Sequence, residues 1–344
     1  MTGRVLHGIL DGVGDTPLVE LTGLLPRLGS RVFAKLESHN PGGSVKDRSA
    51  LSMLLGRIRG GDLVPGRSTV VESSSGNLAI GLAQICRYFG IDLVCVVDPK
   101  TTEQNLAVLR AYGVTVDMVT EVDPETKAYL PARIKRVREL LATLPGAYWP
   151  NQYANPLNPL AHERTMAEIA QALDGRVDYL FCSTGTGGTL TGCARHIRAH
   201  GLSTTLVGVD ALGSVLFGGV SAPRLLPGHG AAVRPALFDP TLADEVVHVS
   251  DLESVVACRT LIAREAILAG GSSGAVTAAL GKFAARIPAG RNVVLVFPDR
   301  GDRYLDTIYS DDWVRAHFGE VSHLWQDPEL LWQDPELTPA VGTC

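Results

Sequence analysis

The sequence predicts an α/β protein with two doubly wound, largely parallel sheets. Short apolar runs rich in β-branched residues alternate with longer stretches of helical periodicity along most of the 344 residues. Strands that are apolar on both faces are typical of parallel sheets covered by helices on each side. With 45% hydrophobic residues and 37 glycines, the chain is long enough for two compact domains.

Predicted strands and helices follow one another in alternation. Strands are expected in the apolar runs at residues 31–37, 93–97, 114–119, 177–182, 205–209, 246–249 and 292–297, and in the stretch 69–77, where a strand gives way to a helix. Helices are expected where apolar residues recur at helical spacing, at residues 45–58, from 78 onward, and at 102–112, 131–144, 160–173 and 252–268. The segment 212–235 is long, rich in Gly and Pro and without a period, which is typical of a functional loop.

A lysine stands at the start of the first predicted helix. Residues 40–48 read Asn-Pro-Gly-Gly-Ser-Val-Lys-Asp-Arg, so a turn rich in Gly and Ser delivers Lys46 to the helix N-terminus. That end of a helix carries partial positive charge and unpaired N–H groups. Because a cation is disfavoured there, the neutral amine becomes available as a nucleophile. We therefore predict that Lys46 is the catalytic residue.

Three further turns rich in glycine or serine follow apolar runs. They lie at residues 73–77, 183–189 and 269–275. The second lies between a predicted strand and a helix, where backbone N–H groups and Thr hydroxyls converge on a phosphate. It is not a Walker A loop, since no Gly-Lys-Ser/Thr follows, and Leu190 stands at the third glycine position of the dinucleotide fingerprint. A lone phosphate is therefore the expected ligand.

With these motifs the chain resembles the fold-type II pyridoxal-phosphate (PLP) enzymes of the cysteine synthase and cystathionine β-synthase group, from about Gly14 to Tyr304. The resemblance implies that Lys46 forms a Schiff base with PLP and that Asn77 hydrogen-bonds the cofactor's 3′ oxygen. It also implies that Ser272 faces the pyridine nitrogen. The residues implied for the cofactor phosphate are Gly185, Thr186, Gly187, Gly188 and Thr189.

The same resemblance implies the substrate-binding residues. A serine-rich loop matches the stretch that binds the substrate α-carboxylate, and Gln152 matches its second contact. The residues of this loop are Ser73, Ser74, Ser75 and Gly76. Ser74 replaces a threonine that is usual in the family but keeps a hydroxyl. Tyr153, Arg133 and Arg300 are also expected to contact substrate, and for Arg133 a solvated basic helix face is the alternative.

The resemblance further implies a β-replacement reaction. Lys46 removes the Cα proton as general base, a leaving group departs from Cβ, and a nucleophile adds to the resulting aminoacrylate. A neutral Ser272 hydroxyl does not hold the pyridine nitrogen protonated as an aspartate would. This favours β-elimination over transamination.

Residues 298–309 resemble a subgroup of this family that joins O-phosphoserine to glutamate in 2,3-diaminopropionate biosynthesis, which supplies siderophores and peptide antibiotics. Arg300 stands where cysteine synthases commonly have a small hydroxyl residue, and a guanidinium suits a phosphate leaving group. Two alternatives stay open. One is a cysteine synthase that uses sulfide, and the other is a non-catalytic amino-acid-binding or regulatory relative.

Composition predicts a soluble cytoplasmic protein with small-molecule substrates. The formal net charge of −5 gives no reason to expect nucleic acid, and no apolar run is long enough for a signal peptide or a membrane span. Six cysteines without a Cys-x-x-Cys pair read as reduced. His196 and His200 are more typical of a solvated helix face than of a metal site, so no metal is expected.

The resemblance also suggests the domain organisation and assembly. A smaller mobile domain of residues 45–148 is expected within a larger PLP-binding domain of residues 1–44 and 149–318. A homodimer is expected, with the apolar N-terminal residues Val5, Leu6, Ile9 and Leu10 as interface candidates. Residues 319–344 form a tail that repeats Leu-Trp-Gln-Asp-Pro-Glu-Leu at 324–330 and 331–337, which we interpret as a duplication in a tolerant terminus.

Overall fold

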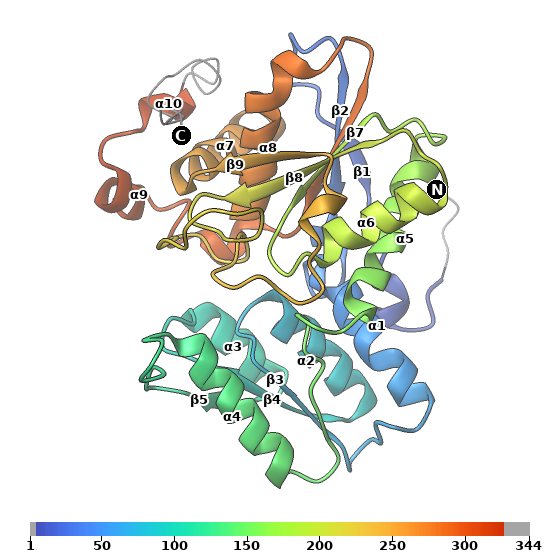
Figure 1. Ribbon diagram of the computed structural model, residues 1–344, viewed down its shortest axis with the longest axis vertical. Helices are drawn as coiled ribbons and strands as arrows, with labels where there is room; N and C mark the ends of the chain where they lie inside the picture. The colour runs from blue at the N-terminus through green and yellow to red at the C-terminus, as the bar shows by residue number, and fades with distance from the viewer. Residues whose placement is uncertain (1–4, 327–344) are drawn as a thin grey trace. The chain divides into compact units, whose positions relative to one another are not determined.

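The structure is a computed structural model that describes residues 5–326 (Figure 1). Within them the chain divides into two compact units. The first unit contains residues 5–15 and Ser38–Ala161, and the second contains Thr16–Glu37 and residues 162–326. The second copy of the tail repeat and most of the first lie outside the described residues.

The first unit is built around a four-stranded parallel sheet in the order β5-β4-β3-β6. Its strands are β3 (Thr69–Glu72), β4 (Asp92–Val97), β5 (Thr115–Met118) and β6 (Ala147–Tyr148). Its helices are α1 (Lys46–Arg59), α2 (Asn77–Phe89), α3 (Glu103–Ala111) and α4 (Tyr129–Thr143). Strands that follow one another along the chain are joined through a helix, as parallel strands require.

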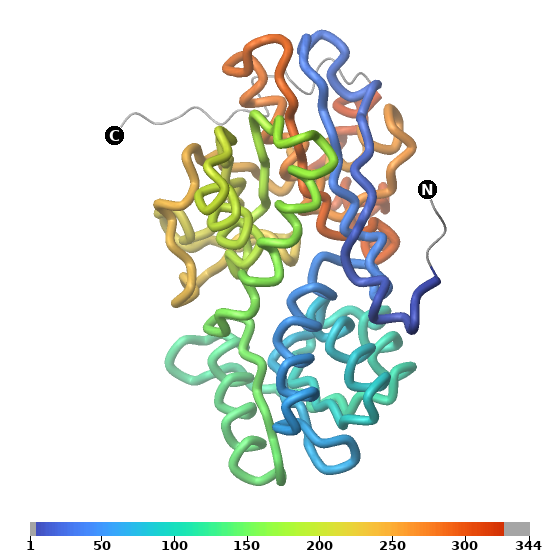
Figure 2. Tube along the Cα trace, turned by 90° about the vertical axis from the view of Figure 1, so that its right-hand side faces the viewer, coloured from blue at the N-terminus to red at the C-terminus, as the bar shows by residue number. Residues whose placement is uncertain are grey.

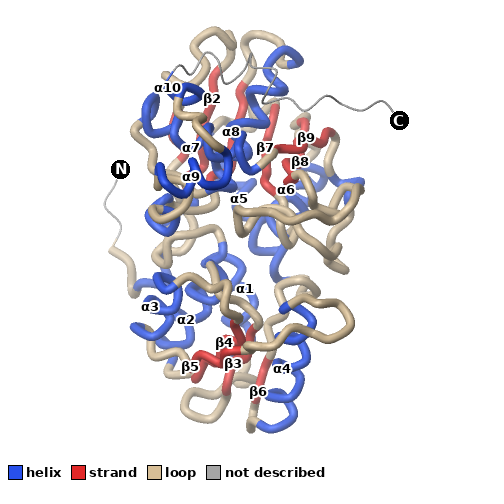
Figure 3. The backbone as a smooth tube through the Cα atoms, turned by 90° about the vertical axis from the view of Figure 1, so that its left-hand side faces the viewer, coloured by secondary structure: helices blue, strands red, loops and turns tan. Residues whose placement is uncertain are grey.

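Helices cover both faces of this sheet. Figure 3 shows α4 on the opposite side of the strands from α2 and α3. Residues facing α1, α2 and α3 are Val70, Leu93, Cys95 and Val97, and those facing α4 are Val71, Val94 and Val96. Because neighbouring residues of a strand point to opposite faces, both sets must be apolar.

The second unit contains a six-stranded sheet in the order β1-β2-β10-β7-β8-β9. Its strands are β1 (Leu18–Glu20), β2 (Arg31–Leu36), β7 (Tyr179–Ser183), β8 (Thr205–Ala211), β9 (Glu245–Val249) and β10 (Asn292–Phe297). Figure 2 shows β1 and β2, in blue, side by side. β1 runs antiparallel to β2, and the remaining pairs are parallel.

Two layers of helices enclose this sheet as well (Figure 1). The helices are α5 (Leu157–Ala172, which begins in the first unit), α6 (Gly188–Ala199), α7 (Asp251–Glu265), α8 (Gly271–Phe283), α9 (Asp311–Phe318) and α10 (His323–Gln326). The core beneath α7 and α8 includes Phe181, Val293 and Leu295, whereas that beneath α5 and α6 includes Leu180 and Val294. Short 3-10 helices span Ile9–Gly12, Glu37–His39, Pro240–Leu242, Ala284–Arg286 and Gly301–Tyr304.

The start of the tail repeat packs onto the second unit itself. Leu324 in α10 is buried in the core shared with α7 and α8, and the Arg259 guanidinium lies 4.5 Å from the centre of the Trp325 ring. Among the described residues, no helix combines the length and the apolar character that crossing a membrane requires.

The predicted fold class is confirmed, and the predicted strands and helices lie within about three residues of the observed bounds. Sequence periodicity missed β1 and β6, since strands of three and two residues are too short to show alternation. The stretch 269–275, expected as a turn between helices, is mostly the first turn of α8.

Close packing of α8 against α7 explains the glycine at position 274. A Cβ there would lie 2.2 Å from the Ser254 carbonyl oxygen and 2.5 Å from Cys258 Sγ. We expect Gly274→Ala to lower the free energy of unfolding by about 1–3 kcal/mol through overpacking. In α1, a Cβ at Gly56 would meet nothing within 4 Å, so Gly56→Ala should instead stabilise the protein by roughly 0.5–1 kcal/mol. Thermal and denaturant unfolding measure both changes, and equal effects of the two substitutions would contradict this account.

Candidate active site

Four helices begin at the turns singled out in the sequence, and no side chain caps any of them. The residues preceding α1, α2, α6 and α8 are Val45, Gly76, Gly187 and Gly270. In contrast, side chains of Thr102, Ser250 and Ser310 cap α3, α7 and α9. α4 also lacks a side-chain cap. The first N–H groups of a helix have no partner within the helix, so uncapped N-termini are suited to anionic ligand groups.

Lys46 is the first residue of α1 and is partly exposed, although its neighbours Val45 and Asp47 are buried. The turn before it is fixed by hydrogen bonds. The Gly42 N–H donates to Asp47 Oδ2 at 2.5 Å, and the Lys46 N–H donates to Ser44 Oγ at 3.2 Å. A Cβ at position 42 would lie 2.6 Å from Asp47 Oδ1, so this position requires glycine. These hydrogen bonds therefore fix the backbone from which the Lys46 side chain extends.

The serine-rich loop connects β3 to α2. Ser73 and Ser74 are buried, and Ser75, Gly76 and Asn77 are partly exposed. The Ser73 hydroxyl is buried without a hydrogen-bond partner, which leaves it available to a ligand. α1 and α2 pack closely near their starts, since a Cβ at Gly81 would lie 3.2 Å from Ala50 Cβ. The structure thus brings Lys46 and the serine loop to neighbouring helix N-termini.

Gln152 lies in a tight segment after β6. Asn151 adopts a left-handed conformation with φ of 49°, and Asn158 Nδ2 donates to the Gln152 carbonyl at 2.8 Å. Gln152 is buried, and its Oε1 has no hydrogen-bond partner. Burial raises the pKa of the adjacent Tyr153. The nearby charge of Arg133 lowers this pKa, and the charge of Glu72 raises it further. Gln152 and Tyr153 therefore lie in a dry environment within reach of charged groups.

Arg133 lies on α4, and Asp98 directly follows β4. The guanidinium Nη1 of Arg133 is 3.4 Å from Asp98 Oδ2. Both side chains are mostly buried, with exposed fractions of 16% and 10%. The Arg133 Nε is buried and has no hydrogen-bond partner. A desolvated guanidinium with an unused donor is well suited to an additional anion.

In the second unit, the loop 183–187 connects β7 to α6. Gly187 has φ of 81°, and a Cβ there would lie 2.4 Å from Phe238 Cδ2, so only glycine fits. Gly185 approaches the Gly228 carbonyl, and the Gly230 N–H donates to the Thr184 carbonyl at 2.7 Å. The loop that contains Pro227–Ala231 therefore lies against the predicted phosphate loop.

Gly188 and Thr189 form the first turn of α6, and Thr186 and Thr189 are partly exposed at its N-terminus. In the same turn, Thr191 Oγ1 is buried without a hydrogen-bond partner. Backbone N–H groups and hydroxyls at a glycine-rich helix start are the groups that bind phosphate. The local geometry of this loop fits a lone phosphate.

Ser272 is the second residue of α8 and is buried. Two tyrosines support this helix start. Tyr304 Oη donates to Asp299 Oδ2 at 2.8 Å, and Tyr309 Oη donates to the Ala269 carbonyl at 2.5 Å. A Cβ at Gly270 would collide with Asp299, so the helix start and the segment after β10 are in close contact. The position of Ser272 is therefore set by packing rather than by a cap.

Arg300 differs from the other predicted residues. Its side chain is 62% exposed, and its Nε lies 3.3 Å from Asp302 Oδ1. An exposed ion pair between near neighbours contributes little binding energy. The side chain of Arg133, in the first unit, is therefore more strongly desolvated than that of Arg300, in the second unit.

Sequence patterns missed Glu72, the last residue of β3. It is fully buried, and its Oε1 accepts hydrogen bonds from the Ser73 N–H and from Trp149 Nε1, each at 2.9 Å. An acidic residue that ends an apolar strand directly before a serine-rich loop was the available signal. Its partner Trp149 lies 77 positions further along, so the sequence could not reveal the contact.

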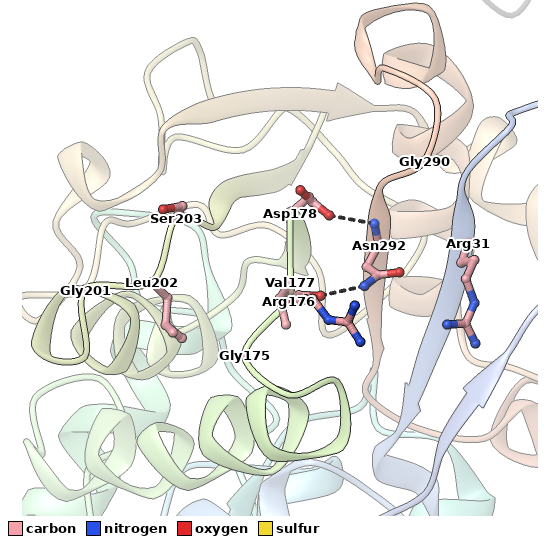
Figure 4. Close-up of a pocket in the computed structure, with 10 residues that line it drawn as sticks. All are labelled: Arg31, Gly175, Arg176, Val177, Asp178, Gly201, Leu202, Ser203, Gly290 and Asn292. Carbon is pink, nitrogen blue, oxygen red and sulfur yellow. Dashed lines mark hydrogen bonds between the residues drawn. The ribbon is translucent and has the colours of Figure 1, made fainter.

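A polar depression in the second unit contains none of the predicted residues (Figure 4). It lies at the amino-terminal ends of β2, β7 and β10, around Arg31, Asp178 and Asn292. Asp178 Oδ2 accepts from the Asn292 N–H at 2.8 Å, and Asn292 Nδ2 donates to the Arg176 carbonyl at 2.7 Å. Since ligands of open α/β sheets bind at the carboxyl ends of strands, and these groups already bond one another, this depression is not the candidate site.

Both sets of residues fit PLP in chemical terms. The first unit supplies a lysine and buried polar atoms without partners, at Ser73 Oγ and Gln152 Oε1. The second supplies a phosphate-type loop, a buried hydroxyl at Ser272 and a glycine cradle that a Cβ would fill at position 187.

Comparison with known proteins agrees with this chemistry. Two curated relatives carry the name N-(2-amino-2-carboxyethyl)-L-glutamate synthase. The protein from Ralstonia nicotianae is 46% identical over 90% of this chain and 91% of its own length. The protein from Cupriavidus metallidurans is 47% identical over 90% of this chain and 92% of its own length.

Solved structures of similar fold include an O-ureido-L-serine synthase and an O-acetylserine-dependent cystathionine β-synthase from Helicobacter pylori. Both have a TM-score of 0.81 and 32% identity, and they cover 91% and 90% of this chain and 100% of theirs. Residues 9–299 match the family described as pyridoxal-phosphate dependent enzyme. The chain therefore belongs to the pyridoxal-phosphate dependent enzyme family.

Proposed function

We propose that this enzyme performs β-replacement on O-phospho-L-serine with the amine of L-glutamate, which gives N-(2-amino-2-carboxyethyl)-L-glutamate and phosphate. The observation that carries the proposal is the 46–47% identity, over 90% of the chain, to two proteins named for that product. Identity to the solved structures, whose titles name other serine-derived reactions, is 32%. The reaction breaks the Cβ–O bond of phosphoserine and forms a bond from Cβ to the glutamate nitrogen.

We assign the residues as follows. When bound, PLP supplies an electron sink for the bonds around the substrate Cα. Lys46 holds the cofactor, takes the Cα proton as general base and returns it after the nucleophile has added. Asn77 and Ser272 orient the cofactor ring, and its phosphate is bound by Gly185, Thr186, Gly187, Gly188 and Thr189. The uncapped start of α6 supports the phosphate assignment.

Substrate recognition is assigned to residues of the first unit. The loop of Ser73, Ser74, Ser75 and Gly76, together with Gln152, binds the α-carboxylate. The unpartnered hydroxyl of Ser73 can donate to the carboxylate and supports this role, and the side-chain amide of the buried Gln152 carries N–H donors as well. Arg133 and Tyr153 bind a second anionic group, either the phosphate of the donor or a carboxylate of glutamate. The mostly buried guanidinium of Arg133 supports this over a purely solvated basic helix face.

Further proposals concern setting and assembly. We propose a cytoplasmic homodimer whose product serves siderophore or peptide natural-product biosynthesis, without nucleic-acid or membrane partners. Val5, Leu6 and Ile9 are exposed by 84%, 44% and 52%, which supports an interface at the N-terminal segment. Leu10 contributes instead to the core of its own unit. A smaller domain near residues 45–148 that moves relative to the rest remains part of the proposal.

The first prediction concerns the substrate pair. Purified PLP-loaded protein should release phosphate from O-phosphoserine, and glutamate should accelerate the release while a product of the expected mass accumulates. Phosphate assays and mass spectrometry measure the two. Turnover of O-acetylserine with sulfide, and none of phosphoserine with glutamate, would favour a cysteine synthase. No turnover with any pair would favour a non-catalytic relative.

The second prediction concerns Lys46. Replacing Lys46 by Ala removes the proposed general base, and kcat should fall by roughly 10²–10⁴-fold or more. Lys127→Asn is the matched control, since Lys127 is exposed with φ of 54°, a conformation that asparagine tolerates. Steady-state kinetics at saturating PLP measure both variants. Retained turnover in the Lys46 variant would remove this residue from the mechanism.

The third prediction separates the two candidate arginines. Arg133→Met removes a desolvated cation and should raise the KM of phosphoserine or glutamate about ten- to a hundredfold, the equivalent of roughly 1.5–3 kcal/mol. Arg300→Met should change either KM by less than about threefold, because that ion pair is exposed. Arg133→Met leaves Asp98 without its ion-pair partner, so the melting temperature of each variant is measured to separate a loss of stability from a loss of binding. A larger effect at Arg300 would reverse the assignment.

A further inference from the structure

Glu72 ends β3 with its carboxylate fully buried, a position where an acidic side chain needs a specific reason. It makes no ion pair among those described between residues 5 and 326. Its surroundings are instead hydrogen-bond donors. Hydrogen bonds from fixed N–H groups stabilise the ionised carboxylate. The same bonds restrain the segments that carry these N–H groups.

These donors come from two separate stretches of chain. Oε1 accepts from the Ser73 N–H, the first residue of the serine loop, and from Trp149 Nε1. The left-handed Asn151, with φ of 49°, lies between the tryptophan and the glutamine. One carboxylate therefore serves the starts of both segments to which α-carboxylate binding is assigned.

Unpartnered polar atoms lie on the same residues. Glu72 Oε2, Ser73 Oγ and Gln152 Oε1 are all buried and lack hydrogen-bond partners. Buried polar groups without partners are uncommon, and those of Ser73 and Gln152 indicate that the two segments joined at Glu72 are prepared for a polar ligand. The Ser73 side chain remains available because Glu72 accepts from the backbone N–H of this residue rather than from its side chain.

We propose that Glu72 is a positioning residue that ties the serine loop 73–76 to the segment 149–152 and so sets the affinity for the amino-acid donor. The inference rests on the proposed function, since it takes these two segments to bind the α-carboxylate. Glu72 acts through the backbone and does not itself contact substrate. Trp149 is its partner on the second segment.

The arrangement gives this tie a pH dependence. Burial raises the pKa of Glu72 to about 7, against the hydrogen bonds from Trp149 and Ser73, which lower it. Facing it are Cys95, its register neighbour on β4, and Tyr153, and burial raises the pKa of both, so both stay neutral at pH 7. Arg133, whose charge lowers the pKa of Tyr153, forms an ion pair with Asp98. Protonation of Glu72 as the pH falls through about 7 weakens its charge-assisted hydrogen bonds, so the donor KM should rise.

Hydrogen exchange tests the tie without any substrate. In PLP-loaded Glu72→Gln protein, exchange should accelerate in peptides covering both 73–77 and 149–153, since a neutral amide oxygen is a weaker acceptor than a carboxylate for the Ser73 N–H and Trp149 Nε1. Trp149→Phe, which removes one donor and keeps an aromatic ring, should produce the same paired change to a smaller extent. Glu253→Gln is the matched control, a buried carboxylate of the second unit that caps α7. Acceleration in only one segment, or in neither, would overturn the proposal.

Kinetics then test the consequence for binding. Glu72→Gln should raise the donor KM at least tenfold at pH 8 and change kcat less than threefold. The ratio of wild-type to Glu72→Gln kcat/KM, in which titration of the substrate cancels, should fall as the pH is lowered from 8 to 6. An unchanged KM despite looser segments would overturn the inference and leave the proposed reaction intact. If the wild type turned over no donor, the proposed function would fail, and paired exchange would still decide whether Glu72 couples the segments.

Discussion

The structure depends on how four helix starts are held in place without a side chain of the N-cap residue. A side-chain cap contributes about 0.5–2 kcal/mol to a helix, and α1, α2, α6 and α8 forgo it. Elsewhere in the chain the same need is met, as at α7, where Ser250 and Glu253 form a capping box. These four starts are the glycine- and serine-rich turns that the proposed reaction uses, although α4 is uncapped as well. Packing must hold these starts in place instead.

Contacts around glycine supply that packing. Gly187 lies where a Cβ would enter the Phe238 ring, and Gly270 lies where it would enter the Asp299 carboxylate. In the first unit, Gly42 is held by Asp47 at the start of α1. Each glycine lets the backbone approach a neighbouring group more closely than any side chain would permit. Loops rich in glycine are usually flexible, but here the glycines allow rigid, solvent-poor turns to form.

Much of this could be predicted from the sequence because each signal is local. Apolar runs gave the strands buried on both faces, and the turn residues gave the helix starts, including Lys46 and the loop 183–189. The long-range contacts could not be predicted. The pairing of Glu72 with Trp149 and of Arg133 with Asp98 joins residues far apart in sequence. Arg300 looked as suitable as Arg133 by charge alone, and only burial separates the two.

The central claim is that Lys46 carries the cofactor from the uncapped start of α1. Borohydride reduction of the PLP-loaded protein, followed by peptide mass spectrometry, tests it most directly, because reduction fixes the cofactor on the lysine that holds it. The account predicts a single modified peptide that contains Lys46. Modification of another lysine, or of none, would contradict it.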